Sequence, residues 1–225
     1  MKRILKIGMD VHTTNYTLCA MEPIIGEDDR VFATIKVTPD YKNILMFIEN
    51  LKLKLGLNDE YDIQCGYEAG CLGYSLYNQL TAAGIKCVIL APTTMLTPQG
   101  VRIKTDMRDA YMIAQCLSYG GYHAVYIPTE DDDSVKEYLR MRNDHKLALK
   151  KIKQQINAFC IRHGFCYDGT KWTLSHLKWL KKLEITNGLY RETLDEYMAS
   201  YEEQEAKIER YDKRIGEIAE QTRYH

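Results

Sequence analysis

The chain has 225 residues, of which 45% are hydrophobic and 27% are charged, and its formal net charge at pH 7 is −1. This length and apolar content suit one domain with an appendage that buries a real core. No run approaches the roughly 18 apolar residues of a membrane span, and the start, MKRILKIGMD, reaches Asp10 before any stretch of signal-peptide length. The seven cysteines are scattered and odd in number, which argues against a disulfide framework. We therefore expect a cytoplasmic protein.

Strands and helices alternate along the first half of the chain. Residues 3–12, 15–22 and 30–37 predict three consecutive strands in an antiparallel meander. Periodicity and turn residues then predict a helix over 40–55, a strand over 61–69, a helix over 73–84, a strand over 85–92, a helix that begins near Asp106 and a short strand over 124–128. Strands that alternate with helices after a meander predict an α/β fold, with a mixed sheet and flanking helices.

A long basic helix is predicted over residues 135–163, after the acidic run TEDDDS that marks a boundary and favours a helix start. Residues 134–182 carry 12 Lys and Arg against 3 Asp and Glu, within an otherwise acidic chain. Such a basic segment is typical of a nucleic-acid partner. The cations expected to contact it are Arg142, Lys146, Lys150, Lys151 and Lys153.

The last part of the chain carries a heptad repeat. The repeat positions are Leu194, Tyr197, Tyr201, Gln204, Ile208, Tyr211, Ile215 and Ile218. Their spacing predicts a coiled coil, formed with the preceding helix or with another subunit, and a helix packed on its own domain is the alternative. The pattern runs to the last residues without a stop signal, so we expect a truncated segment. The predicted divisions are 1–133, 134–182 and 183–225.

Four carboxylates stand where their side chains can meet. Asp10 and Glu68 each lie near the end of a predicted strand, where functional groups gather in open α/β sheets. Asp106 and Asp109 are three residues apart and share one helix face. Like charges this close destabilise a fold unless a cation lies between them. The pattern favours a Mg²⁺ (or Mn²⁺) site that acts on phosphodiesters, with ordinary capping acids as the alternative.

Basic and polar residues lie beside these carboxylates in the sequence. Arg102, Lys104 and Arg108 flank the helix aspartates and are expected to hold phosphates. His12 follows Asp10 closely and is interpreted either as a donor near the metal or as a packed polar residue.

Several motifs carry a family resemblance. GMDVH, YEAGCLGYSLYNQL, VILAP and RIKTDMRDA occur in this order, followed by the basic helix LRMRNDHKLALKKIKQQINAFCIRHG. Together they resemble the DEDD transposases of the IS110 family of insertion sequences, which are bridge-RNA-guided recombinases. The N-terminal domain of that family is similar to RuvC-type Holliday-junction resolvases, with an RNase H-like fold. The resemblance therefore implies a RuvC-like domain over 1–133, and it assigns the catalytic metal-binding tetrad to Asp10, Glu68, Asp106 and Asp109.

The resemblance also implies a function. Family members cut and exchange DNA strands with the help of a serine in a second domain, so we expect the N-terminal part of a transposase that is inactive alone. Basic helices would bind guide (bridge) RNA and DNA, and the coiled coil would pair subunits into a dimer or tetramer, in a bacterial or archaeal cytoplasm and without a membrane partner. No serine here lies in a motif that matches the nucleophile. The alternative is a non-catalytic fragment that binds RNA and DNA, dimerises and regulates transposition.

Three other interpretations are weaker. IGMDV followed by a meander also opens sugar-kinase-like ATPases, but no glycine-rich phosphate loop follows. A tyrosine recombinase would need an Arg, His and Tyr constellation in a helical domain, and the sequence offers none. CIRHGFC contains Cys160, His163 and Cys166 as possible zinc ligands, but no second pair lies at metal-site spacing.

Overall fold

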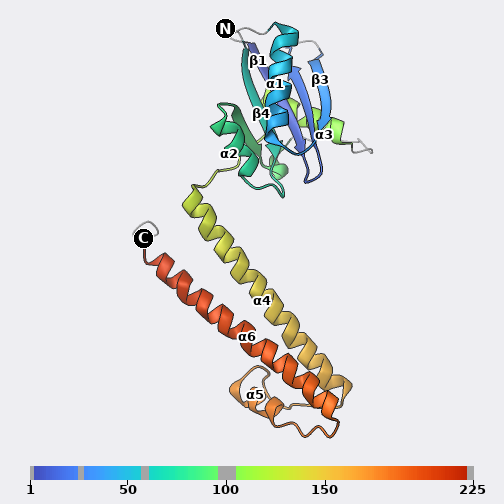
Figure 1. Cartoon of the computed structure of the whole chain (residues 1–225), viewed down its shortest axis with the longest axis vertical. Coiled ribbons are helices and arrows are strands. Elements are labelled where there is room, and N and C mark those ends of the chain that lie inside the picture. The colour runs from blue at the N-terminus through green and yellow to red at the C-terminus, as the bar shows by residue number, and fades with distance from the viewer. Residues whose placement is uncertain (1–2, 25–27, 57–60, 96–104, 222–225) are drawn as a thin grey trace. The chain divides into compact units, whose positions relative to one another are not determined.

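The computed structural model describes residues 3–24, 28–56, 61–95 and 105–221. Two compact units make up the chain, Met1–Ile127 and Pro128–His225. The first contains a sheet with its helices, and the second contains two long helices with a short one between them in sequence (Figure 1).

One five-stranded sheet forms the first unit, with the strand order β3-β2-β1-β4-β5. Strands β1 (Arg3–Val11), β2 (Tyr16–Glu22) and β3 (Arg30–Val37) pair antiparallel in sequence order. Strand β4 (Tyr61–Glu68) pairs parallel with β1, and β5 (Lys86–Leu90) pairs parallel with β4. The predicted meander and the predicted mixed α/β sheet are confirmed. Because β1 is central, its end lies between β2 and β4.

Helices cover both faces of this sheet (Figure 1). On one face, the odd-numbered β1 residues Leu5, Ile7 and Met9 are fully buried in a cluster with α1 (Tyr41–Leu55) and α2 (Ser75–Ala82). Alternation along a strand sends the even-numbered residues to the opposite face.

Helix α3 (Asp106–Tyr119) lies on that opposite face, where it contacts β1, β2 and β4. The contact depends on Gly8, because a Cβ there would lie 2.1 Å from the carbonyl oxygen of Ala110. Gly66 of β4 faces the same helix, since a Cβ there would lie 2.8 Å from the Leu117 side chain. The backbone of α3 therefore sits directly on β1, at a distance that only glycine permits.

Asp29, just before β3, holds the second half of α3. Its carboxylate accepts hydrogen bonds from Gln115 Nε2 at 3.1 Å, from the Tyr111 hydroxyl at 3.4 Å and from the Tyr119 hydroxyl. These bonds tie the connection between β2 and β3 to the helix, so α3 is fixed along its length.

The second unit consists of α4 (Glu130–Arg162), α5 (Leu174–Lys181) and α6 (Gly188–Ala219). Helices α4 and α6 lie side by side. Near the α5 end, the buried core residues are Ile156, Phe159, Cys160, Leu180, Leu194, Met198 and Tyr201. Across the described residues, no helix combines the length and the apolar character that crossing a membrane requires.

The heptad positions of α6 form the surface that packs on α4. Gln204 Oε1 lies 2.8 Å from His145 Nδ1, and the Tyr211 ring packs on the His145 ring at 5.1 Å between centroids. Ile215 and Ile218 line an apolar groove with residues near the start of α4. The repeat therefore faces the preceding helix, whereas coiled-coil geometry and contact with another subunit stay predictions.

Two predicted elements differ from the structure. Helix α4 begins at Glu130 and not at residue 135, because Thr129 of the acidic run is the N-cap and the four acidic residues after it form the first turn, where the helix dipole stabilises negative charge. The predicted strand over 124–128 is only an isolated antiparallel bridge between Leu90 and Ala124. The backbone N–H of Val125 also donates to the Ile89 carbonyl at 2.8 Å, so the start of this segment lies along β5 without forming a strand.

Candidate metal and nucleic-acid site

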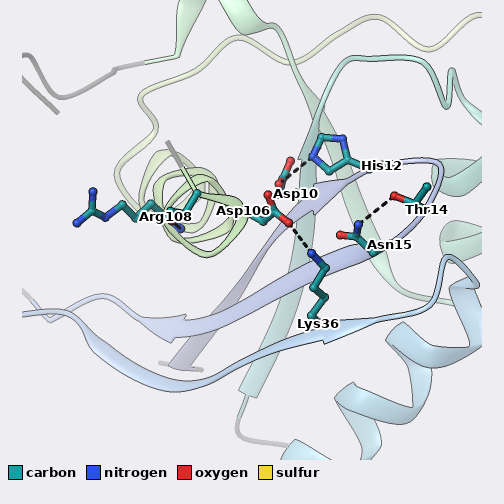
Figure 2. A network of polar contacts seen from close by, with 8 residues as sticks. Asp10, His12, Thr14, Asn15, Lys36, Asp106 and Arg108 are labelled. Carbon is teal, nitrogen blue, oxygen red and sulfur yellow. Dashed lines mark hydrogen bonds and ion pairs between the residues drawn. The ribbon is translucent and has the colours of Figure 1, made fainter. Parts of the chain in front are cut away.

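Side chains from distant parts of the chain meet at the end of β1. Ligand atoms of Asp10, His12 and Asp106 all lie within 4.8 Å of one another, and Figure 2 shows the three side chains close together. His12 Nε2 lies 3.1 Å from Asp10 Oδ2. Within the part of the chain that the structure describes, no other three potential metal ligands meet this closely, so the cysteines of CIRHGFC form no such group.

The start of α3 brings Asp106 to this place. Thr105 caps the helix, since its side chain accepts a hydrogen bond from the Arg108 N–H, and Asp106 is the first helical residue. The close contact at Gly8 sets this helix against β1, two residues before Asp10. Two carboxylates that are far apart in sequence are therefore neighbours in the fold.

Asp109 and Glu68 lie nearby, although neither belongs to the group of three. The charge of Asp109 contributes to raising the pKa of Asp10, which places Asp109 within electrostatic reach. Glu68 ends β4, and because Met9 pairs with Tyr67, Glu68 is next to Asp10 in register. Like Gly66, Glu68 stands on the strand face that α3 covers. All four predicted carboxylates are thus at one end of β1, β4 and α3.

The local environment raises the pKa of Asp10. Desolvation of its carboxylate is the main cause, His12 opposes the shift, and the charges of Asp109 and Asp106 add to it. The neutral form of the acid is therefore favoured. At neutral pH the ionised Asp10 costs stability, and a bound cation would offset that cost.

Asp106 is in the opposite situation. Lys36 of β3 places its Nζ 2.8 Å from Asp106 Oδ2, and this hydrogen bond and charge lower the pKa of Asp106. The sequence carries no local signal for Lys36, because it lies 70 residues from Asp106 and reaches it only through the strand pairings. His12 had such a signal in its position two residues after Asp10.

The cations predicted around the aspartates have different positions. Arg108 extends from α3 away from Asp10 and Asp106, as Figure 2 shows. It is exposed, where it can meet a phosphate group outside the carboxylate group itself. Arg102 and Lys104 lie outside the described residues.

The cations predicted on α4 fall into two classes. Arg142 forms a bidentate ion pair with Asp212 of α6, at 2.7 and 2.8 Å. Lys153 lies 3.7 Å from Glu205 and 5.3 Å from the ring centroids of Trp172 and Tyr201, so it belongs to the contact between the helices. The other three, Lys146, Lys150 and Lys151, are exposed. Of these, Lys146 also acts on α6, since its charge adds to the hydrogen bond from Arg142 that lowers the pKa of Asp212.

Asp10→Asn should raise the melting temperature of the metal-free protein at pH 7. An acid whose pKa is raised in the folded state stabilises that state fully below its unfolded value of 3.8, and this contribution is lost as pH rises through the folded value. Asparagine does not ionise, so the variant avoids this loss of stability, which is about 1.4 kcal/mol for each pH unit by which folding raises the pKa of Asp10. Melting in EDTA at pH 4 and pH 7 measures it, and the gain should be larger at pH 7.

Asp106→Asn is the matched control, because Lys36 lowers the pKa of Asp106 and the sign is reversed. This variant should not stabilise the protein at either pH. A lower melting temperature for Asp10→Asn than for the unsubstituted protein at pH 7 would contradict the assigned cause.

Comparisons with known proteins identify the family of the chain. A family model for the DEDD transposases of IS110, described as "Transposase", matches residues 7–161, which include Asp10, Glu68, Asp106 and Asp109. The chain belongs to this family. The predicted membership of the IS110 transposases is therefore confirmed.

Relatives of this IS110-family chain are named as transposases. It is 33% identical over 228 residues to the "Transposase for insertion sequence element IS1533" of Leptospira borgpetersenii, covering 100% of this chain and 63% of that protein. It is 35% identical over 131 residues to the "Putative transposase y4qE" of Sinorhizobium fredii, covering 58% of this chain and 34% of that one. The chain thus spans less than two thirds of the length of either relative.

The solved structures similar to the chain include RuvC of T. thermophilus in complex with a Holliday-junction substrate. The likeness has a TM-score of 0.35 at 13% identity, and it covers 54% of this chain and 99% of that one.

Proposed function

We propose that this IS110-family chain is the metal-binding part of a transposase that cuts and exchanges DNA strands at specific sites. The observation that carries the proposal is the meeting of Asp10, His12 and Asp106 at the end of β1, with Asp109 and Glu68 beside them. These residues come from three separate parts of the chain. Acids gathered this closely repel one another, and a divalent cation among them would relieve that repulsion.

The donor set fits a hard divalent cation. Carboxylate oxygens are the ligands that Mg²⁺ and Mn²⁺ prefer, and one imidazole is compatible with Mn²⁺. Asp10, Glu68, Asp106 and Asp109 would hold the cations, with His12 keeping Asp10 oriented through its hydrogen bond. When bound, such cations polarise a phosphodiester and stabilise the leaving oxygen.

The protein itself would position the nucleic acid. Exposed cations near the start of α3 and along α4 would attract the phosphate backbone of DNA and of a guide RNA. The nucleophilic serine of the family has no counterpart among the motifs of this chain, so strand exchange would need a serine from outside these 225 residues. The chain by itself would then bind metal and nucleic acid without exchanging strands.

Subunit pairing through the second unit is part of the proposal. Leu139 and Leu147 of α4 are 43% and 56% exposed, although both are large and apolar. Pairing with a second copy of the chain would bury these two side chains. The same features would serve the alternative function, a non-catalytic protein that binds RNA and DNA and regulates transposition. If the unsubstituted protein binds no divalent cation, the alternative function is favoured.

Reversing the charge of Lys146, Lys150 and Lys151 to Glu should lower nucleic-acid affinity by about 10- to 100-fold at 0.15 M salt, because phosphate contacts dominate such binding. About three fewer counterions should be released on binding, so the affinity should depend less steeply on salt concentration. Fluorescence anisotropy with labelled RNA and DNA over a salt series measures both. Arg142 and Lys153 are left unchanged, since their substitution would disturb the contact between α4 and α6.

The matched control reverses three cations of α6, Lys207, Lys213 and Arg214, to Glu. This variant makes the same change in net charge within a segment that is acidic overall. Its nucleic-acid affinity should fall far less. Equal losses in the two variants would show that only net charge matters, and unchanged affinity in the α4 variant would refute the assignment of α4.

A further inference from the structure

Three residues form a row across the antiparallel strands at the edge of the carboxylate group. Thr17 of β2 pairs with Asp10 of β1 on one side and with Lys36 of β3 on the other. Directly opposed residues of antiparallel strands present their side chains on the same face. Asp10 is an even-numbered residue of β1, as is Gly8, so this is the face that α3 covers.

Lys36 reaches from this row to the first residue of α3. Its Nζ lies 2.8 Å from Asp106 Oδ2, and Figure 2 shows the side chain extended toward the aspartates. Both partners reach solvent, with 53% of the Lys36 side chain and 41% of the Asp106 side chain exposed. An exposed ion pair contributes little to stability, and a lysine side chain is long and flexible. The pair can therefore open at little cost.

Thr17, the middle residue of the row, carries a buried hydroxyl without a hydrogen-bond partner in the described part of the chain. The residue is 0% exposed, and its Oγ1 has no hydrogen-bond partner among the described residues. A buried hydroxyl without a partner costs stability, and a ligand or a water molecule beside it would remove that cost. It lies between Asp10 and Lys36 in the row, where an occupant of the carboxylate group would be near it.

We propose that Lys36 exchanges partners when the site is loaded. In the metal-free protein its ammonium neutralises Asp106 in place of a divalent cation. When a divalent cation binds the carboxylates, the Lys36 ammonium leaves Asp106 and contacts a non-bridging phosphate oxygen of the nucleic-acid backbone. Lys36 is then a phosphate-positioning residue that also offsets one negative charge of the metal-free site. The inference rests on the proposed metal site and adds to it the group that links metal binding to strand binding.

Lys36→Met tests the first half of the exchange. Removing the ammonium removes a competitor for Asp106, so Mn²⁺ should bind about two- to fivefold more tightly, as judged from the strength of exposed ion pairs. Isothermal titration calorimetry with Mn²⁺ alone measures this. The control is Lys86→Met: Lys86 pairs with Asp62 at 2.7 Å in the same sheet, at the other end of β4, and its loss should leave Mn²⁺ affinity unchanged.

Strand binding tests the second half. With saturating Ca²⁺, Lys36→Met should weaken binding of a labelled single-stranded DNA and reduce the salt dependence by about one counterion, whereas in EDTA it should change neither. Lys36→Arg should restore the binding in Ca²⁺, because a guanidinium also contacts phosphate.

The outcomes separate the inference from the proposed function. If the unsubstituted protein binds no Mn²⁺, the metal site itself is wrong. If it binds Mn²⁺, but Lys36→Met and Lys86→Met have the same affinity for it, the metal site stands and the exchange is overturned. Equal loss of DNA binding in Ca²⁺ and in EDTA would also overturn the exchange, since Lys36 would then contact DNA regardless of the metal.

Discussion

Mg²⁺ or Mn²⁺ should raise the melting temperature of the first unit by about 5–10 °C when the cation is at 100 times its dissociation constant. At that ratio a ligand bound only to the folded state adds about 2.7 kcal/mol. Each kcal/mol corresponds to about 2–4 °C in a cooperative unit of 150–250 residues, and the smaller first unit gives a shift at the upper end of this range or above it. Differential scanning calorimetry is the suitable measurement, because the two units of the chain can melt in separate transitions.

Asp10→Ala combined with Asp109→Ala should abolish this stabilisation. The control removes two acids from the first turn of α4, with Glu130→Ala and Asp131→Ala, which are exposed and lie in the other unit. That variant should keep the full response to the cation. Stabilisation of equal size in the Asp10 and Asp109 double variant would show that the cation binds acids in general and not this site.

Gly8→Ala should destabilise the first unit by about 3 kcal/mol or more, at the upper end of overpacking costs. The new Cβ would lie 2.1 Å from the Ala110 carbonyl oxygen and 2.3 Å from the Ala114 nitrogen, and both are backbone atoms that cannot turn aside. Helix α3 would have to move as a whole, and it carries Asp106 and Asp109. The melting temperature should fall by roughly 6–12 °C, and Mn²⁺ binding should weaken in any fraction that remains folded.

Gly216→Ala is the control for this change, since nothing lies within 4 Å of a Cβ at that position in α6. Alanine is favoured over glycine inside a helix by about 0.5–1 kcal/mol, so this variant should stabilise the second unit slightly. A Gly8→Ala protein that melts at the same temperature as the unsubstituted one would show that α3 does not rest on β1 as described.

The sequence predicted what depends on local pattern. The strand that ends near Asp10, the helix that begins at Asp106 and the meander before them follow from periodicity and capping residues, and the structure contains all three. The proximity of Asp10 to Asp106 followed from the rule that functional groups gather at strand ends. The family resemblance pointed to the same residues.

What could not be predicted depends on pairings between distant segments. Lys36 reaches Asp106 only because three strands pair in one particular register, and a strand pattern does not fix register by itself. The charge of α4 predicted a nucleic-acid surface but could not separate its cations. Arg142 and Lys153 meet acids of α6 that lie 70 and 52 positions away, so they contact the neighbouring helix.

Gln204, the one polar member of the apolar repeat in α6, has a consequence for the alignment of the two long helices. Its amide oxygen meets His145 Nδ1, and the Tyr211 hydroxyl lies 3.5 Å from Nε2 of the same ring. Sliding α6 by one turn, about 5.4 Å, would keep apolar residues opposite apolar residues but would leave both ring nitrogens without these partners. Hydrophobic contacts hold α4 and α6 together, but they would permit several alignments. The two polar contacts of His145 select one of them.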